Sequence, residues 1–403
     1  MKKKNSIKAI LLFSSADSNA SSALIIPLMG IFAVMFPDSD TQISMLISLP
    51  SLIMVPVILM TGRLSRYYSK KTLLNIGAAL FVVGGFSGCL WENLTFILIA
   101  RAISGVGCGM IYPLIPTLVT YFFDEDERTE MMGWANGAGS ILAMLMSLVS
   151  GFLAVINWRY PFMIMLLYTL LLVAQIRVLP AIPPERDDAS ITPCLGQTPR
   201  MGWLIYVSVF VTFVYFMISM VWILKISIFI GSEGLGNATN AGIASSILTF
   251  TAFVFSLAFP YVFRVLNRFT SVVCLVTLGA CFYFLSIAQS FNMVILSSVC
   301  MGCSLGFIIP YMNTRVSILA PVGTKTCAFS LVSGAIYTGQ FVAVFYFNVV
   351  QGMVVGESLR SVFSIIAGNL AVCTVIAILF ILGSHLYEQK HCQSKAVRIV
   401  DRA

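Results

Sequence analysis

Ionisable side chains inside long apolar stretches are the first candidates for chemistry in this chain. Asp17 lies about ten residues into the stretch 7–36, and Arg101 lies about seven residues into the stretch 94–123. If both stretches are helices, a rise of about 1.5 Å per residue places Asp17 roughly 15 Å from the start of one and Arg101 roughly 10 Å from the start of the other. The two side chains could lie at similar depth. Asp17 is therefore a candidate for binding and releasing a proton, with Arg101 as its partner or modulator.

The residues around Asp17 support a polar face on this segment. Ser14 and Ser21 lie above and below it at helical spacing, so the face would meet water or a ligand rather than lipid. The protonation of a carboxylate depends on its burial and on nearby charges, so a ligand that disturbs the pair could switch the protonation of Asp17. The alternative is a static buried ion pair between Asp17 and Arg101 that only fixes two helices.

A third ionisable residue, Lys225, lies in the last third of the stretch 201–231 and shares a helical face with Tyr215 and Trp222. An aromatic face with one cation would suit an organic anion, although a lysine near a helix end can also extend to the interface. Further polar and aromatic residues could line the same cavity or serve only helix packing: Tyr112, Asn136, Tyr311, Asn313, Tyr337 and Gln340.

The elements that position these residues follow from composition. The 403 residues are 59% hydrophobic and only 10% charged, whereas soluble domains carry about 25% charged residues. Runs long enough to cross a bilayer core of about 30 Å occur at 7–36, 41–61, 72–91, 94–123, 129–156, 161–179, 201–231, 240–263, 270–289, 291–319, 326–350 and 359–387. The first run is too long for a signal-peptide core, so we expect it to remain as a spanning helix. The sequence thus predicts an all-α membrane protein with twelve transmembrane helices.

The basic residues predict how these helices are oriented. If the N-terminus is cytoplasmic, 20 of the 24 Lys and Arg residues fall in cytoplasmic segments, while only Arg159 and Arg360 fall on the other side. This bias favours cytoplasmic termini in a protein of the cell membrane. It also explains the net charge of +8 by contact with the lipid bilayer, so no nucleic-acid partner is expected.

An internal repeat divides the chain into two halves. One run has Gly105, Gly109, Pro113 and Thr117 at intervals of four, and a later run has Gly302, Gly306, Pro310 and Thr314 at the same intervals, 197 residues further on. Parallel repeats of six helices describe a transporter built from two bundles. We therefore expect two pseudo-symmetric bundles, residues 1–179 and 200–403, joined by a cytoplasmic linker at 180–199.

Three local motifs are similar to those of the major facilitator superfamily. The loop Gly62–Lys71 resembles the family's basic conformational loop, for which the resemblance singles out Gly62, Arg66, Lys70 and Lys71; Arg66 stands where the family has Asp. Arg101–Gly109 matches the family's Arg-xxx-Gly-x-Gly pattern, and Asn157–Phe162 matches a common turn. Of the antiporter signature Gly-Pro-xx-Gly-Gly, only Gly151 is present.

The resemblance implies a monomeric secondary transporter that works by alternating access. With Asp17 as the titrating group, the leading expectation is proton-coupled efflux of a small amphipathic substrate. The alternative is uptake or exchange of an organic anion, since Arg101 and Lys225 outnumber Asp17. A non-transporting receptor or subunit is a third, weaker option. The sequence contains no phosphate-binding loop and only two histidines, so we expect no enzyme activity, cofactor or metal site.

Overall fold

The computed structural model of the chain describes residues 2–14, 17–65, 67–180, 203–319, 325–353 and 358–400, and all regular secondary structure there is helical. Within these ranges, the side chains of some residues, Asp17 and Asn136 among them, lie outside the described part. Eight helical segments are long and apolar enough to cross a membrane, and two shorter apolar helices accompany them among the described residues. The chain is therefore a multi-pass membrane protein, and the predicted all-α class is confirmed.

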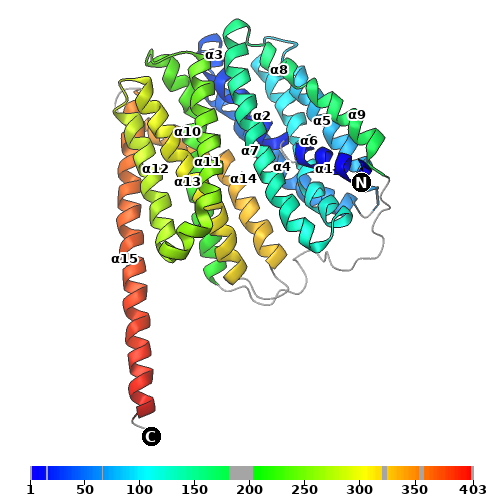
Figure 1. Ribbon diagram of the computed structural model, residues 1–403. Coiled ribbons are helices and arrows are strands. Elements are labelled where there is room, and N and C mark those ends of the chain that lie inside the picture. The colour runs from blue at the N-terminus through cyan, green and yellow to red at the C-terminus, as the bar shows by residue number, and fades with distance from the viewer. Residues whose placement is uncertain are drawn as a thin grey trace.

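The first half of the chain contains nine α-helices and one 3₁₀ helix in its described residues (Figure 1). They are α1 (Lys2–Ser14), α2 (Asp17–Ile25), η1 (Ile26–Leu28), α3 (Met29–Met35), α4 (Asp40–Leu64), α5 (Lys70–Ser87), α6 (Leu94–Phe122), α7 (Glu125–Ile156), α8 (Tyr160–Ile164) and α9 (Leu167–Val178). Helices α1 to α9 form one group on one side of the molecule.

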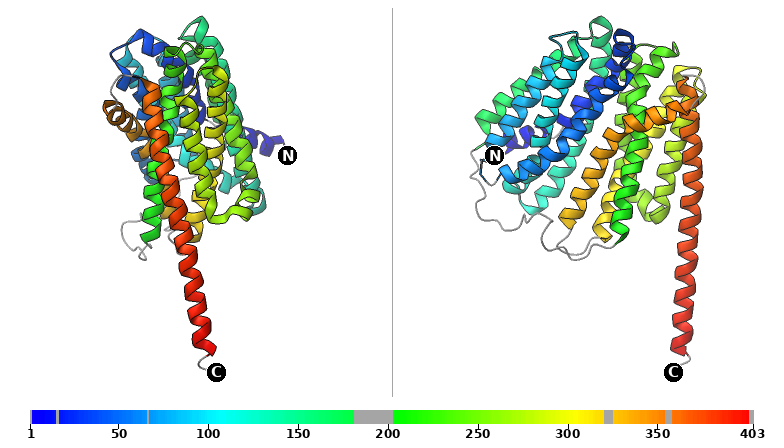
Figure 2. Two further views of the ribbon diagram at one scale, coloured as in Figure 1. Left: turned by 90° about the vertical axis from the view of Figure 1, so that its left-hand side faces the viewer. Right: turned by 180° about the vertical axis from the view of Figure 1, so that it is seen from behind.

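The second half forms the neighbouring group, which Figure 2 shows from two further directions. Its described elements are α10 (Trp203–Ser232), α11 (Ala238–Leu266), η2 (Asn267–Phe269), α12 (Thr270–Ser286), α13 (Phe291–Leu319), α14 (Lys325–Gly352) and α15 (Leu359–Val400). Helix α15 runs well beyond the rest of the bundle (Figure 2). The two groups meet where α4 packs on α14, α7 on α11, and η1 and α3 on α10.

The helices follow the predicted runs to within a few residues, with exceptions in the first, sixth and last runs. The first predicted run contains α1 and, beyond residues 15–16, which lie outside the described part of the chain, α2, η1 and α3; the sixth, 161–179, is divided into α8 and α9. Pro27 lies in the short 3₁₀ turn between α2 and α3, where its missing N–H cannot continue an α-helical ladder. The last helix continues to Val400 rather than to residue 387.

The repeated glycines make equivalent contacts in the two halves. A Cβ atom at Gly105 of α6 would lie 2.8 Å from the Cα of Pro50 in α4, and one at Gly302 of α13 would lie 2.6 Å from the carbonyl oxygen of Leu248 in α11. Helices α4 and α11 are the second long spans of their respective halves. The repeat therefore reproduces a helix–helix crossing that requires a residue without a side chain.

The repeated Pro–Thr pairs are also equivalent. The hydroxyl of Thr117 donates to the carbonyl of Pro113 at 2.9 Å, and that of Thr314 donates to the carbonyl of Pro310 at 2.8 Å. A threonine bonded to the carbonyl four residues earlier is a common way to satisfy its hydroxyl within a membrane helix. The 197-residue periodicity thus extends from packing to hydrogen bonding.

We predict that Gly105→Ala destabilises the first half. The added Cβ would meet the backbone of α4, which cannot move aside like a flexible side chain, and overpacking of this kind costs about 1–3 kcal/mol. Thermal unfolding of the purified protein in detergent should show a lower Tm. Gly334→Ala is the matched control, because nothing lies within 4 Å of a Cβ at that position. An equal Tm for the two variants would contradict the prediction.

Candidate substrate and coupling site

The Arg101 guanidinium is buried where three helices of the first half meet. Its Nε donates to the carbonyl of Leu46 in α4 at 3.0 Å, and its Nη1 donates to the hydroxyl of Ser21 in α2 at 2.6 Å. The side chain is only 1% exposed. Its Nη2 has no hydrogen-bond partner among the described atoms. Arg101 is therefore a buried cation, and neutral acceptors bond two of its three guanidinium nitrogens.

A proline explains why the Leu46 carbonyl is available. In a regular α-helix this oxygen would accept the N–H of residue 50, but Pro50 has no N–H to donate. The carbonyl of Leu46 is thus left free inside α4, and Arg101 supplies the missing donor. Because Gly105, one turn along α6, packs directly on Pro50, the arginine motif and the proline form one unit.

The two serines of the predicted polar stripe around Asp17 have different partners. Ser21 lies in α2 and bonds Arg101, whereas Ser14 ends α1 and is buried against α9, where it accepts a hydrogen bond from Nε2 of Gln175 at 2.6 Å. Asp17 begins α2, four residues before Ser21, and its side chain lies outside the described residues. Pairing of Asp17 with Arg101 therefore stays a prediction. Ser21, which lies one helical turn after Asp17, does bond Arg101.

Lys225 has an acidic partner that the sequence analysis missed. Its Nζ lies 2.6 Å from Oδ1 and 2.5 Å from Oδ2 of Asp40, the first residue of α4, and 4.2 Å from the ring centre of Phe347 in α14. Lys225 is 1% exposed and the Asp40 side chain 44%. The ion pair joins the two halves. In the sequence, Asp40 directly precedes the run 41–61 and Lys225 lies in the last third of the run 201–231, toward the same side of the membrane.

Tyr215 and Trp222 face the interior of the second half. The Tyr215 hydroxyl bonds the hydroxyl of Ser304, and Nε1 of Trp222 donates to the hydroxyl of Ser297 at 2.9 Å. Both serines belong to α13, and both aromatic side chains are buried. On the predicted face of α10, Tyr215 and Trp222 therefore bond α13 within the second half, whereas Lys225 pairs with Asp40 of the first half.

Two of the predicted cavity residues meet between the halves. The rings of Tyr112 in α6 and Tyr337 in α14 contact edge to face, with centroids 5.9 Å apart, and Tyr112 is 45% exposed. Near them, the hydroxyl of Ser51 in α4 donates to Oε1 of Gln340 in α14 at 2.9 Å. These four residues place polar and aromatic groups at the interface between the halves.

The remaining predicted cavity residues are more scattered. Tyr311 is buried with its ring 6.2 Å from that of Phe263, and Asn313 is exposed. Asn136 belongs to α7, but its side chain lies outside the described part of the chain.

The halves are closed against each other at one end. We call this the distal end; it is the end where α3 leads into α4 and α10 into α11, at the top of Figure 1. Here the Ser227 hydroxyl donates to the carbonyl of Pro27 at 2.9 Å, and Asn348 donates to Thr41 at 3.1 Å. In the described residues, the hydrogen bonds between the halves extend from the middle of the bundle to this end.

Glycines allow the closest approach at the distal end. Gly151 in α7 and Gly242 in α11 face each other, such that a Cβ on Gly242 would lie 2.7 Å from the carbonyl oxygen of Ser147 and 2.9 Å from the Cα of Gly151. Gly151 is the one residue retained from the antiporter signature. Its packing explains why that position keeps a glycine in this chain.

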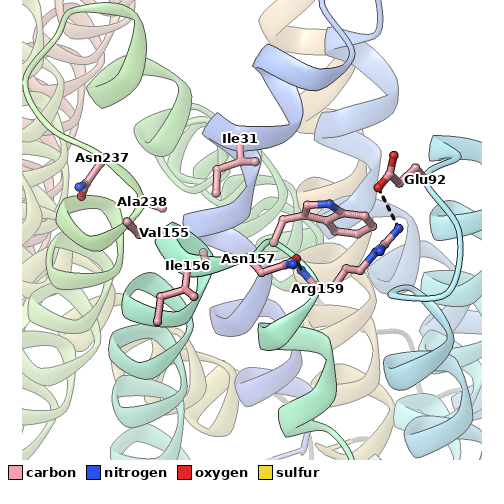
Figure 3. A pocket seen from close by; sticks show the side chains of 10 residues that line it. Ile31, Glu92, Val155, Ile156, Asn157, Arg159, Asn237 and Ala238 are labelled. Carbon is pink, nitrogen blue, oxygen red and sulfur yellow. Dashed lines mark hydrogen bonds and ion pairs between the residues drawn. The ribbon is translucent and has the colours of Figure 1, made fainter.

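An open depression lies on the surface of the distal end (Figure 3). Its volume is about 520 Å³, and it is lined by the end of α7, the turn that follows, and residues Asn237 and Ala238 of the second half. At its rim, Arg159 pairs with Glu92 at 2.8 Å and lies 5.2 Å from the centre of the Trp158 ring. None of the predicted substrate residues lines it.

The predicted conformational loop joins α4 to α5. Gly62 and Lys70 belong to the flanking helices; Lys70 is buried and Lys71 is half-buried, while Arg66 lies outside the described residues. Ser69, at the family's second Gly position, is the N-cap of α5: its hydroxyl accepts the N–H of Thr72 at 3.1 Å. Serine is a favoured N-cap residue, which explains this departure from the motif.

Comparison with known families identifies the class of protein. A sequence model of the Major Facilitator Superfamily matches residues 10–344. The chain therefore belongs to this superfamily of transporters, as the motifs predicted.

Curated relatives match only short segments. Efflux pump dotC of Dothistroma septosporum is 30% identical over 26% of this chain and 18% of its own length. Multidrug resistance protein MdtL of Vibrio parahaemolyticus is 24% identical over 30% of this chain and 31% of its own. Quinolone resistance protein NorA of Staphylococcus aureus is 22% identical over 34% and 36%. The chain thus matches less than two fifths of the length of each of these relatives.

Solved structures share the whole fold. Nucleoside transporter NupG superposes with a TM-score of 0.70 at 16% identity and covers 94% of this chain and 99% of its own. A POT family transporter in complex with 5-aminolevulinic acid gives 0.73 at 13% identity, covering 93% and 95%. A D-xylose-proton symporter gives 0.70 at 14%, covering 92% and 96%. The predicted major facilitator fold is confirmed.

We predict that Gly242→Leu opens the distal end, because a side chain there cannot fit against Ser147 and Gly151. Overpacking costs about 1–3 kcal/mol, which should shift the equilibrium roughly 5- to 150-fold toward open conformations. Spin labels at Asp38→Cys and Ser232→Cys, both exposed at the distal end, should report longer distances. Gly231→Leu, with no atom near its Cβ, should leave them unchanged. An identical distance distribution in both variants would refute the role of Gly242.

Proposed function

We propose that this chain exports small amphipathic compounds in exchange for protons, by alternating access around a site between its two halves. The observation that carries the proposal is the Arg101 guanidinium, which is 1% exposed, is bonded to Ser21 and has one nitrogen without a partner among the described atoms. Such a cation in the membrane calls for a counter-charge. Asp17, one helical turn before Ser21, is the carboxylate in reach of that role.

Coupling would arise because a proton and the Arg101 guanidinium compete for the Asp17 carboxylate. Ionised Asp17 would neutralise Arg101, whereas a proton on Asp17 would leave the guanidinium without a counter-charge. The two protonation states therefore favour different arrangements of α2, α4 and α6, the helices that Arg101 joins. Because α4 also contacts the second half through Ser51 and Asp40, a rearrangement of α4 would reach the interface between the halves.

Export is supported by the names of the relatives, since dotC, MdtL and NorA are an efflux pump, a multidrug resistance protein and a quinolone resistance protein. We propose that the protein works as a monomer in the cell membrane. The end opposite the distal end, where Arg63, Lys71 and Arg177 lie, would face the cytoplasm with both termini, in keeping with the positive-inside rule.

Uptake or exchange of an organic anion is the second candidate function. The observation in its favour is the pair of buried cations, Arg101 and Lys225, each 1% exposed. In the alternative, substrate negative charge rather than Asp17 would balance Arg101. A proton gradient would then have no direct effect on transport.

We predict that Asp17→Asn abolishes proton coupling. Proteoliposomes with an acidic lumen should accumulate a fluorescent quinolone, the compound class in the name of the NorA relative. The variant should take up the compound at least about tenfold more slowly, a loss of about 1.4 kcal/mol in the rate-limiting step, should not concentrate it in the lumen, and its residual rate should not respond to the gradient. A panel of other fluorescent amphipathic compounds extends the assay if the quinolone is not transported.

Asp38→Asn is the matched control, because it removes the same charge from an exposed position at the distal end. It should keep the gradient response of the wild type. Gradient-driven accumulation that survives in Asp17→Asn would disprove the proposed role of Asp17. Accumulation of an anionic compound without any response to the gradient would favour the alternative.

A further inference from the structure

Lys225 is buried in one half of the molecule, while its counter-ion comes from the other. The lysine and the Phe347 ring beneath its ammonium belong to α10 and α14 of the second half. Asp40 belongs to α4 of the first half and is far more exposed, at 44% against 1% for the lysine. Any motion that separates the halves at the distal end removes the carboxylate and leaves the lysine in place.

Separation of this pair leaves the Lys225 ammonium without a counter-ion. A buried ion whose partner is removed is strongly destabilising, so a distal opening favours an anion that replaces Asp40. The group that Lys225 binds in the closed state is a carboxylate, with both oxygens at 2.5–2.6 Å from Nζ. The Phe347 ring 4.2 Å away adds an apolar surface. Arg101, which is also buried, is bonded within the first half.

We propose that Lys225 and Phe347 form a subsite for the carboxylate of an aromatic or amphipathic organic acid, and that Asp40 occupies this subsite when the distal end is closed. The proposal rests on alternating access as the proposed function, and it names a substrate class: compounds with a carboxylate attached to an apolar body. Asp40 is then an internal competitor. Removal of its charge should strengthen binding of an external carboxylate, whereas a purely structural ion pair predicts no such gain.

Benzoate and its neutral isostere benzamide can test the subsite on the purified full chain in detergent. Tm would be followed against ligand concentration at constant ionic strength. Asp40→Asn should bind benzoate about tenfold more tightly than the wild type. In the wild type only the molecules in which Asp40 has left Lys225 can bind benzoate, and this small fraction weakens the apparent affinity. Asp40→Asn/Lys225→Met, which lacks both charges and so avoids an unpaired ion, should show no benzoate-dependent Tm shift. Benzamide should shift none of them.

Glu233→Gln is the control for charge at the distal end. It breaks a second ion pair, Arg360 to Glu233 at 2.7 Å, which lies within the second half, and it should respond to benzoate as the wild type does. The proposal is overturned if Asp40→Asn and Asp40→Asn/Lys225→Met give the same benzoate response, including none, or if Glu233→Gln tightens binding as much as Asp40→Asn. The readout needs no gradient and no flux, so failure of proton coupling would leave it unaffected.

Discussion

The position of the buried Arg101 guanidinium depends on one backbone carbonyl of α4 that its own helix leaves unpaired. Pro50 withdraws the hydrogen bond that the Leu46 oxygen would otherwise accept, and Arg101 replaces it. The arginine is thereby fixed in the first half with one further bond to Ser21. Burying a guanidinium is costly unless its N–H groups are satisfied, so α2, α4 and α6 must keep their present arrangement as long as Arg101 has no other partner.

The repeat shows which of these features belong to the fold and which belong to this site. Gly105 and Gly302 support equivalent crossings in the two halves. The 197-residue offset, however, places Ser298 opposite Arg101, and among the described residues that serine bonds its own helix, at the carbonyl of Val294. The duplicated scaffold is therefore symmetric in packing and asymmetric in charge. Packing alone accounts for the glycines; the arginine is an addition to one half.

Local patterns predicted much of this structure, and long-range pairing was beyond them. Hydrophobic length defined nearly all the helices, because a membrane span needs a continuous apolar run. Ser21, one helical turn after Asp17, bonds Arg101, while the pairing of Asp17 itself with Arg101 stays a prediction. The partner of Lys225 was missed because Asp40 lies in the other half and at the start of its helix, outside the predicted run 41–61. The 3₁₀ turn between α2 and α3 depends on local geometry around Pro27 that hydropathy does not report.

Helix α4 contacts both Arg101 and Lys225, so a single movement of this helix can affect both cations although they lie in different halves. It carries Asp40 for Lys225, the Leu46 carbonyl for Arg101 and Ser51 for Gln340. Two of these contacts reach the second half and one remains in the first. A shift of α4 that strengthens its hold on Arg101 changes its distance to α10 and α14 as well. Since interiors packed this tightly favour discrete arrangements over gradual ones, α4 is the element through which the charge state near Arg101 and closure of the distal end can depend on each other.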